Sequence, residues 1–323
     1  MFKKAVRKTK NSWLFLKILI KWFNDYLYLP LTRHHWELYY IIHRLCWREL
    51  HDFPNLVDCR DFNDRIQWLK LFDQDREIIR CSDKILVRDY VRERVGEAYL
   101  VELYQVHNHF DEIDFDTLPN SFVIKTNHDS GTVILVRDKS QFNRSAAKEK
   151  IEQSLKSFYG WQNGEWAYSY IKPKVFVEQY IDPLSTSPPP DYKFHCVNGQ
   201  VKWLQYIFDR GQNTKECIVD INGNATKDHF DQNMQHSEKF SKTVNWDNLL
   251  FCASKLSIGF KYVRVDLFEN NGHIFVGELT FYPLMGCYKT EGQKKLGQLL
   301  DFNRKTFKPF LISKLNSELK NAK

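Results

Sequence analysis

The sequence predicts an α+β protein in which antiparallel hairpins alternate with helices. Three Asn-Gly pairs mark hairpin turns between runs rich in β-branched and aromatic residues, at 198–199, 222–223 and 271–272. Apolar residues at helical spacing occupy the segments before and between these turns, over 62–96, 146–158 and 246–257. With 323 residues, 43% of them hydrophobic, the chain can bury a substantial core in two or three subdomains.

The first 48 residues are predicted to form a basic, amphipathic helical tail. Residues 1–24 contain seven Lys or Arg and no acid, and the run WLFLKILIKWF, 13–23, is apolar except for Lys17 and Lys21. This run is too short and too interrupted to span a bilayer, which needs about 20 apolar residues. We therefore expect residues 1–24 to lie on an anionic membrane surface, with Trp and Phe in the lipid and Lys at the headgroups. The alternative is a helix that docks on the protein body or on a partner.

The distribution of charge and the cysteine content indicate which classes of partner and which cellular compartment are expected. The remaining 299 residues carry 40 basic and 40 acidic side chains, which argues against the broad cationic surface that nucleic-acid binding requires. The seven cysteines are scattered, odd in number and free of CxxC spacing, which is typical of reduced thiols in the cytosol. We expect a cytoplasmic protein, peripheral at the inner face of the cell membrane, without a nucleic-acid partner.

Three further regions follow the tail. Residues 49–118 are expected to be mainly helical and to end in an acidic turn. Residues 119–186 begin with strand, small polar loop and strand (VIKTNHDSGTVILV, 123–136), and continue with a helix and the strand KVFVEQYI, 174–181. A proline-rich joint leads into residues 187–323, which hold the three hairpins, one helix and a helical C-terminal end.

The last hairpin of the chain brings charged side chains together. Side chains on a strand alternate between faces, and a three-residue turn at 271–273 sets Asp266 opposite Glu278 and Arg264 opposite Thr280. The other face is apolar and fixes this register, because a slip by one residue would expose it. Its members are Val263, Val265, Leu267, Phe275, Leu279 and Phe281.

The chemistry of these side chains indicates a bound cation. Two carboxylates that face each other on a sheet repel, so the pair needs a counter-charge. Mg²⁺ with oxygen ligands meets this need, and it would bridge the carboxylates to a phosphorylated ligand. The alternative is a solvated polar face without a ligand. Lys125, just before the loop NHDSG, can reach phosphates under that loop, although the spacing matches no Walker A motif.

Several blocks, in order, resemble the ATP-grasp superfamily and most closely its TupA-like branch, which acts in polysaccharide and teichuronopeptide biosynthesis. The blocks are FNDRIQWLKLFD (62–73), SDKILVRDYV (82–91), FDEIDFDTLPNSFVIKTNHDSG (110–131), KPKVFVEQYI (172–181), DYKFHCVNGQ (191–200), GFKYVRVDLF (259–268) and GELTFYP (277–283). The resemblance covers most of residues 60–300. It implies an ATP-grasp fold, in which two α+β subdomains clasp ATP, preceded by the N-terminal helical region.

The resemblance also assigns roles to residues. Arg264 would stabilise the transferring phosphoryl group, while Asp266 and Glu278 would hold Mg²⁺. The ATP phosphates would be bound by Lys125, Asn127, His128, Ser130, Gly131 and Lys193. A hinge strand would meet the adenine with Glu178, Gln179, Tyr180 and Ile181.

The chain departs from the branch at Asp129 in the loop and at Leu284-Met285 after the last strand. The charge of Asp129 opposes triphosphate binding unless its side chain turns to a cation or caps its own loop. Lys84 and Arg88 are candidates for phosphate or substrate contacts, and a salt bridge on a helix surface is the simpler interpretation.

The activity implied by the resemblance is an ATP- and Mg²⁺-dependent carboxylate–amine ligation through an acylphosphate. Its substrates would be a carboxylate on a glycan or lipid-linked glycan acceptor, and an amino acid or other amine donor. Three alternatives stay open. They are a glycan kinase on the same fold, a glycosyltransferase that uses the acidic triplets 73–75 and 114–116, and a degenerate nucleotide-binding scaffold.

Overall fold

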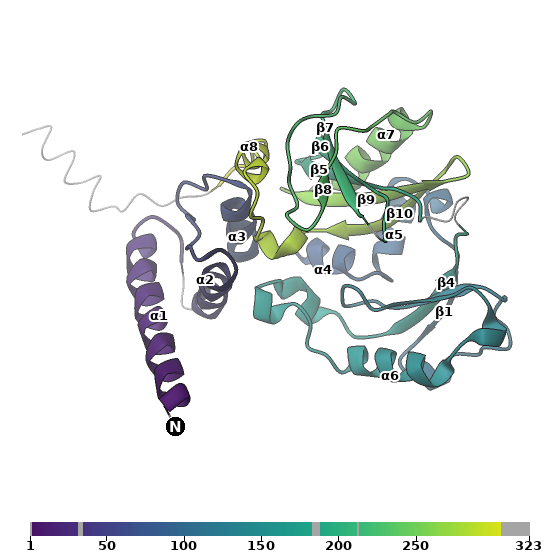
Figure 1. Ribbon diagram of the computed structural model, residues 1–323, viewed down its shortest axis with the longest axis horizontal. Coiled ribbons are helices and arrows are strands. Elements are labelled where there is room, and N and C mark those ends of the chain that lie inside the picture. Colours follow the sequence, from purple (N-terminus) through teal and green to yellow (C-terminus); the bar gives the residue numbers. More distant parts are fainter. Residues whose placement is uncertain (1, 32–34, 183–187, 212, 305–323) are drawn as a thin grey trace, which may run out of the picture.

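Two β-sheets face each other, and helices from the N-terminal part of the chain close one end of the molecule (Figure 1). This computed structural model describes residues 2–31, 35–182, 188–211 and 213–304, with side chains from residue 11 onward. The helical C-terminal end predicted from the sequence lies, beyond residue 304, outside the described residues.

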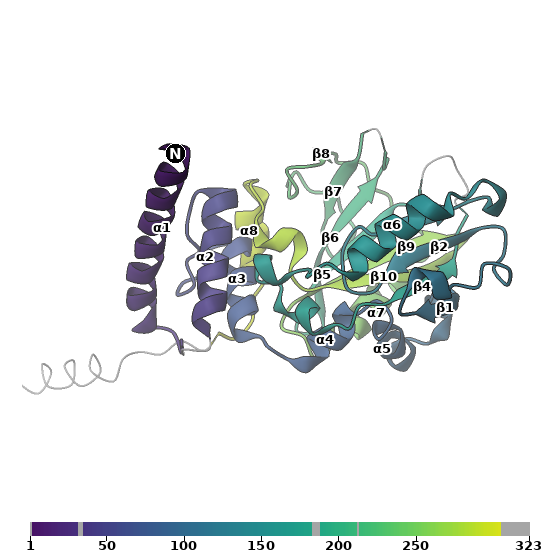
Figure 2. The same cartoon turned by 90° about the horizontal axis from the view of Figure 1, so that it is seen from below.

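Helices make up the first part of the described chain. They are α1 (Phe2–Tyr26), α2 (Trp36–Leu50), α3 (Phe62–Phe72), α4 (Arg76–Ser82) and α5 (Val87–Arg94). Asp61 and Asp75 begin α3 and α4 as N-caps, because their carboxylates accept backbone N–H groups of the first turn. Figure 2 shows α1, α2 and α3 side by side in a row. The helices predicted over 62–96 are confirmed.

The smaller sheet has the strand order β1-β4-β2-β3, with all neighbours antiparallel. Its strands are β1 (Leu103–His107), β2 (Phe122–Thr126), β3 (Val133–Val136) and β4 (Val175–Gln179). α6 (Arg144–Leu155) covers one face, where Ile151 packs in one apolar cluster with Phe122 and Val177. β1 is a strand that the sequence did not predict, within a region expected to be mainly helical.

The larger sheet has the order β10-β9-β5-β6-β7-β8, antiparallel except for the short parallel pair β7 and β8. Its strands are β5 (Asp191–Val197), β6 (Gln200–Phe208), β7 (Lys215–Val219), β8 (Gln235–His236), β9 (Val263–Asn270) and β10 (His273–Thr280). α7 (Trp246–Ser257) contributes Leu249 and Leu256 to the core cluster that holds Phe194 and Val265. The turn at 198–199 joins β5 and β6 as predicted.

The last hairpin reaches the predicted register by a different route. Asn270 pairs with His273, so the turn has two residues rather than three, and a bulge at Gly277 supplies the extra residue. Asp266 therefore lies opposite Glu278, as predicted, and Arg264 lies opposite Thr280. The turn at 222–223, also predicted as a hairpin, closes only an isolated bridge between Val219 and Ala225.

The bulge changes which residues face the core on β10. Phe275, predicted on the apolar face, instead stacks on Phe268 with ring centroids 5.2 Å apart. Ile274 and Val276 take the buried positions, because the two-residue turn shifts the first half of the strand by one residue. The prediction for Phe275 was wrong for this reason.

The segment after the last strand is held by α3. The turn η7 (Pro283–Gly286) contains Leu284 and Met285, both in the left-handed conformation at φ 46° and 57°, which is costly for residues other than glycine. Gln67 and the fully buried Lys70 donate hydrogen bonds to the carbonyl of Met285, at 2.9 and 2.8 Å. α8 (Gly292–Gln298) then packs against the same helix, α3.

Candidate active site between the two sheets

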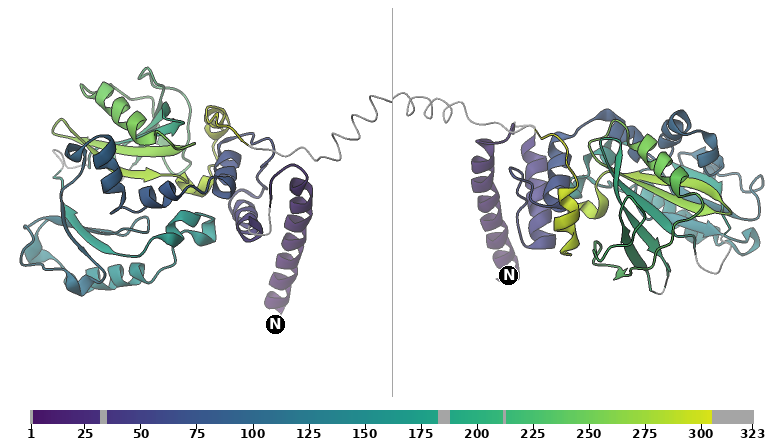
Figure 3. Two further views of the ribbon diagram at one scale, coloured as in Figure 1. Left: turned by 180° about the vertical axis from the view of Figure 1, so that it is seen from behind. Right: turned by 90° about the horizontal axis from the view of Figure 1, so that it is seen from above.

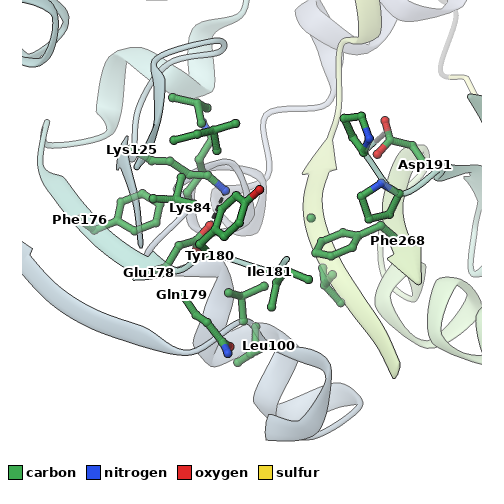
Figure 4. A pocket seen from close by; sticks show the side chains of 18 of the residues that line it. Lys84, Leu100, Lys125, Phe176, Glu178, Gln179, Tyr180, Ile181, Asp191 and Phe268 are labelled. Carbon is green, nitrogen blue, oxygen red and sulfur yellow. Dashed lines mark hydrogen bonds and ion pairs between the residues drawn. The ribbon is translucent and has the colours of Figure 1, made fainter. Parts of the chain in front are cut away.

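A cavity of about 410 Å³ lies between the two sheets. Figure 4 shows Lys125 and Glu178 on the side of the smaller sheet, with Asp191 and Phe268 across from them on the larger one. All four predicted hinge residues, 178–181, line this cavity. Its volume is typical of sites that take small molecules and cofactors.

A group of charges lies on the smaller-sheet side of the cavity. β2 and β4 are neighbours, and the ammonium of Lys125 donates to Glu178 Oε1. The guanidinium of Arg88, from α5, lies 3.9 Å from Glu178 Oε2, and Arg88 is only 8% exposed. The interpretation of Arg88 as part of a surface salt bridge was therefore wrong. Two cations beside one carboxylate leave excess positive charge where anionic phosphates could bind.

Lys84 extends from the turn between α4 and α5 toward the loop after β2. Its ammonium donates to the backbone carbonyl of Asp129, and the residue lines the cavity. Burial lowers the pKa of Lys84, while the charges of Glu278 and Asp129 act in the opposite direction. Lys84 thus lies between the loop on the smaller sheet and a carboxylate on the larger one, and its interpretation as a surface salt bridge was also wrong.

The predicted phosphate loop is anchored from within. Asn127 is buried: its amide donates to Asp83 and to the carbonyl of Lys172 at 3.0 and 3.1 Å, and its oxygen accepts the N–H of Lys174. His128 is buried as well, with Nε2 3.1 Å from the carbonyl oxygen of Ser154. Their side chains hold the loop in place, so contact with a nucleotide through them stays a prediction.

The tip of this loop is open. Ser130 and Gly131 are exposed, and Gly131 has φ +95°, in the left-handed region that favours glycine. These two residues place backbone at the tip of the loop, where a phosphate could approach; that contact, too, stays a prediction.

Asp129 turns into its own loop, away from the cavity. It is 5% exposed, and its carboxylate accepts hydrogen bonds from the hydroxyls of Thr126 and Ser154, both at 2.6 Å, and of Thr132. Burial opposes its ionisation, but these hydroxyls outweigh that effect and lower the pKa of Asp129. Of the two outcomes left open by the sequence, the carboxylate takes the one in which it caps its own loop.

Replacing Asp129 with Asn should weaken nucleotide binding, because the amide cannot accept all three hydroxyl hydrogen bonds and the loop loosens. We expect the Kd for a non-hydrolysable ATP analogue with Mg²⁺ to rise roughly tenfold, the equivalent of one charge-assisted hydrogen bond. Titration calorimetry measures this, with Asp138→Asn as the matched control, since Asp138 caps an exposed turn of the same subdomain. Tighter binding by Asp129→Asn would instead show that the native charge repels the triphosphate.

The larger sheet carries a compact ionic group made by neighbouring strands. Arg264 on β9 donates two hydrogen bonds to the two oxygens of Asp266, both at 2.7 Å, and one to Thr280 at 3.1 Å. Lys193 on β5 donates to the same carboxylate at 2.9 Å. Glu278 Oε1 is 3.5 Å from Arg264 and 3.2 Å from the Thr280 hydroxyl. The structure thus brings together Arg264, Asp266, Glu278 and Thr280 as the sequence analysis predicted, and it adds Lys193 to them.

The carboxylates of Asp266 and Glu278 differ in burial and in the charges around them. Burial raises the pKa of Asp266, but Arg264 and Lys193 outweigh this effect and lower it to about 2. Burial also opposes the charge of Arg264, and Asp266 outweighs it and raises the pKa of the guanidinium. The side chain of Glu278 is 39% exposed and has a looser set of partners. Glu278 is therefore the carboxylate with room for a new ligand.

The donor set fits Mg²⁺ that is shared with a phosphorylated ligand. In the described part of the chain, no group of three or more His, Cys, Asp or Glu side chains could hold a metal by itself. Asp266 and Glu278 supply carboxylate oxygens on adjacent strands, and Mg²⁺ is commonly bound by one or two carboxylates with substrate phosphates and water. The residues fit the ion only if the phosphates complete its coordination.

Arg210 is a candidate site residue that the sequence analysis missed. It follows β6, lines the cavity and pairs with Asp191 at the start of β5. Burial lowers its pKa, while Asp266 and Glu278 raise it. No sequence motif marks Arg210; only the strand order β9-β5-β6 brings it near the carboxylates.

Comparison with known proteins identifies the family. The model of the TupA-like ATP-grasp family matches residues 64–301. A search of curated proteins finds no significant match. Similar solved structures include D-alanine–D-alanine ligase from Bacillus anthracis complexed with ATP, at 16% identity, with 62% of this chain and 54% of that chain covered and a TM-score of 0.36.

Two more solved structures show the same level of similarity. The ATP-grasp ligase PsnB complexed with minimal precursor is 14% identical over 69% of this chain and 60% of that chain, with a TM-score of 0.37. A RimK domain protein from Sphaerobacter thermophilus DSM 20745 is 13% identical over 74% and 76%, with a TM-score of 0.40. The chain spans about half of the Bacillus ligase, at 54%. The family match covers most of the sequence, and this part of the chain contains the two facing sheets and the charged cavity between them. The chain belongs to the TupA-like ATP-grasp family.

Proposed function

We propose that the protein is an ATP- and Mg²⁺-dependent ligase that joins a carboxylate on a cell-surface polysaccharide, or on its lipid-linked precursor, to an amine. One observation carries the proposal: Lys125 lines one side of the cavity, and Arg210 and Gly277 line the other, next to the ionic group of Arg264, Asp266 and Glu278. One side would hold the phosphates by charge, and the other would hold a cation that offsets their negative charge.

The residues of the chain position reactants and supply charge. Lys125 and Lys193 would bind phosphate oxygens, and Mg²⁺ held by Asp266 and Glu278 would neutralise charge on the phosphates. A carboxylate oxygen of the acceptor attacks the γ-phosphorus, the bond to the β–γ bridging oxygen breaks, and ADP leaves. Arg264 stabilises the charge on the transferring phosphoryl group. The amine then attacks the acyl carbon, inorganic phosphate leaves, and the surplus amine proton passes to solvent.

The acidic triplets that suggested a glycosyltransferase have other roles in the structure. Asp73 pairs with Lys261, and Asp75 caps α4. Asp114 and Asp116 lie in an exposed turn near β1, and none of these four acids lines the cavity or pairs with the ionic group of Arg264, Asp266 and Glu278. The geometry therefore favours the ligase over the glycosyltransferase.

Cysteine burial supports a cytoplasmic location for this reaction. All seven cysteines are free thiols and all are buried, as in proteins of a reducing compartment. We propose that the protein works at the inner face of the cell membrane, where a lipid-linked acceptor would be within reach. We also retain the proposed division into a small nucleotide-binding subdomain, 119–186, and a second one, 187–323, and add β1 to the sheet of the first.

The test is a product analysis that uses the full chain, Mg-ATP, amino acids and uronic-acid oligosaccharides labelled with ¹⁸O in the carboxylate. A ligase that works through an acylphosphate releases ADP and inorganic phosphate that carries one ¹⁸O, together with an amide. A glycan kinase would give ADP and a phosphate ester without free phosphate. Failure of the native chain to bind Mg²⁺ and a non-hydrolysable ATP analogue in titration calorimetry would overturn both the ligase and the kinase. The degenerate nucleotide-binding scaffold would then be the function that is left.

A further inference from the structure

The outer face of α1 carries an uncovered apolar stripe, formed by residues at alternating intervals of three and four. They are Trp13, Leu16, Ile20 and Phe23 on the helix and Leu27 just after its end, which are 53, 53, 55, 62 and 51% exposed; Trp13 is at the edge of the stripe, where its ring also meets Trp47 of α2. Residues at these intervals lie along one face of a helix. Both views in Figure 3 place α1 at the end of the molecule that is remote from the sheets. A row of four large apolar side chains on one helix face, continued by Leu27 in the turn that follows, is unusual for a surface that only meets water.

The opposite face of α1 is used for packing on α2. Ile18 is fully buried, and the Trp22 and Trp36 rings meet edge to face at 5.4 Å. The ammonium of Lys17 lies 5.2 Å from the ring centroid of Trp47, and Lys21 pairs with Asp25 at 2.8 Å. The two lysines expected at lipid headgroups are therefore on or beside the packed face. The body of the protein fixes α1, so that the stripe, and not the lysine face, is presented outward.

We propose that this stripe is the docking face for an anionic lipid bilayer. Residues 2–10, which begin the same helix, contain five Lys or Arg and no acid, a charge that complements anionic headgroups. Trp and Phe within the stripe are side chains that favour the membrane interface, where α1 would lie in the plane. No helix of the described residues has the length and apolar character to cross a bilayer.

A second copy of the chain fits the stripe less well. The intervals of three and four also occur in coiled-coil seams, which favour Leu, Ile and Val at the contact positions. Here Trp13 and Phe23 are two of the five positions, and five cations at the start of each helix would repel in a parallel pair. The inference is independent of the ligase chemistry, because α1 contributes no residue to the cavity.

The experiment is cosedimentation of the full chain with vesicles of phosphatidylglycerol and phosphatidylcholine in equal parts, and with pure phosphatidylcholine. The proposal predicts binding at least tenfold stronger to the anionic vesicles. A triple variant, L16S/I20S/F23S, should lose at least tenfold in vesicle affinity. The matched control, I221S/V244S/F251S, removes three apolar side chains of comparable or greater exposure from loops and a helix elsewhere, and should bind like the native chain.

Light scattering and circular dichroism complete the experiment. The two triple variants should keep the helix content of the native chain, because every substituted side chain is at least 49% exposed. Native protein that stays in the supernatant with anionic vesicles overturns the proposal. So does equal loss of binding in both triple variants, and so does a native dimer that L16S/I20S/F23S converts to a monomer, which would assign the stripe to self-association.

Discussion

Glu278→Gln should abolish most ATP turnover while leaving the fold intact. The amide keeps the shape of the side chain and can still accept a hydrogen bond from Thr280, but it removes the negative charge that would bind Mg²⁺. Loss of a partner that only supports a metal ligand costs about 10–100-fold, so loss of a direct ligand should cost roughly 100-fold or more in ADP release. Coupled-enzyme assay of ADP at saturating Mg-ATP measures the effect.

The control for this variant lies on the same hairpin. Glu269→Gln changes a carboxylate near the turn of the hairpin, opposite Ile274, that accepts a hydrogen bond from Asn245 and lies apart from the ionic group of Arg264, Asp266 and Glu278. Turnover should be unchanged in Glu269→Gln, and both variants should unfold within about 0.5 kcal/mol of the native chain, as is usual for partly exposed sites. Full turnover by Glu278→Gln would mean that the cation is held elsewhere, and the assignment of this hairpin as the metal site would fail.

Asp266→Asn should lower the free energy of unfolding by about 3–5 kcal/mol, because it leaves the buried Arg264 and the partly buried Lys193 without the carboxylate that both of them contact most closely. Urea denaturation at neutral pH measures the loss. Asp89→Asn removes a carboxylate from an exposed pair with Arg92 and should cost at most about 1 kcal/mol. Equal stability of the native chain and Asp266→Asn would contradict the buried pair.

The same residue sets a direction for the pH dependence of stability. The pKa of Asp266 is about 2 in the folded chain and 3.8 as an ordinary aspartate, so the unfolded state binds the proton more readily. Its stabilising contribution is complete above pH 3.8 and is lost as the pH falls toward 2. The difference in stability between the native chain and Asp266→Asn should therefore shrink over that interval.

The last hairpin shows how far sequence reasoning reaches. Apolar alternation predicted that Asp266 faces Glu278, and burial enforces that pairing. The prediction assumed a three-residue turn, whereas a tighter turn and a bulge at Gly277 give the same pairing with Phe275 on the other face. Bulges depend on what packs against the strand, and a single sequence does not contain that information.

The remaining differences come from contacts between elements distant in the chain. Arg88 resembles a surface residue within its own helix, but in the fold it is buried between the carbonyl of Val101 and Glu178 of a later strand. Arg210 reaches the site through the strand order of the larger sheet. The sequence left open whether Asp129 repels phosphates or caps its own loop, because the Ser154 hydroxyl that helps to hold its carboxylate comes from α6, 25 residues later.

The hold of α3 on the turn after the last strand has a consequence for synthesis on the ribosome. Lys70 and Met285, which share a hydrogen bond, are 215 residues apart in the chain. Because synthesis proceeds at roughly 5–20 residues per second, the carbonyl of Met285 is made on the order of 10–40 s after Lys70, and the ammonium lacks this acceptor until then. The early helices therefore leave the tunnel well before the turn that satisfies the Lys70 ammonium, and during that interval their apolar faces are open to chaperones.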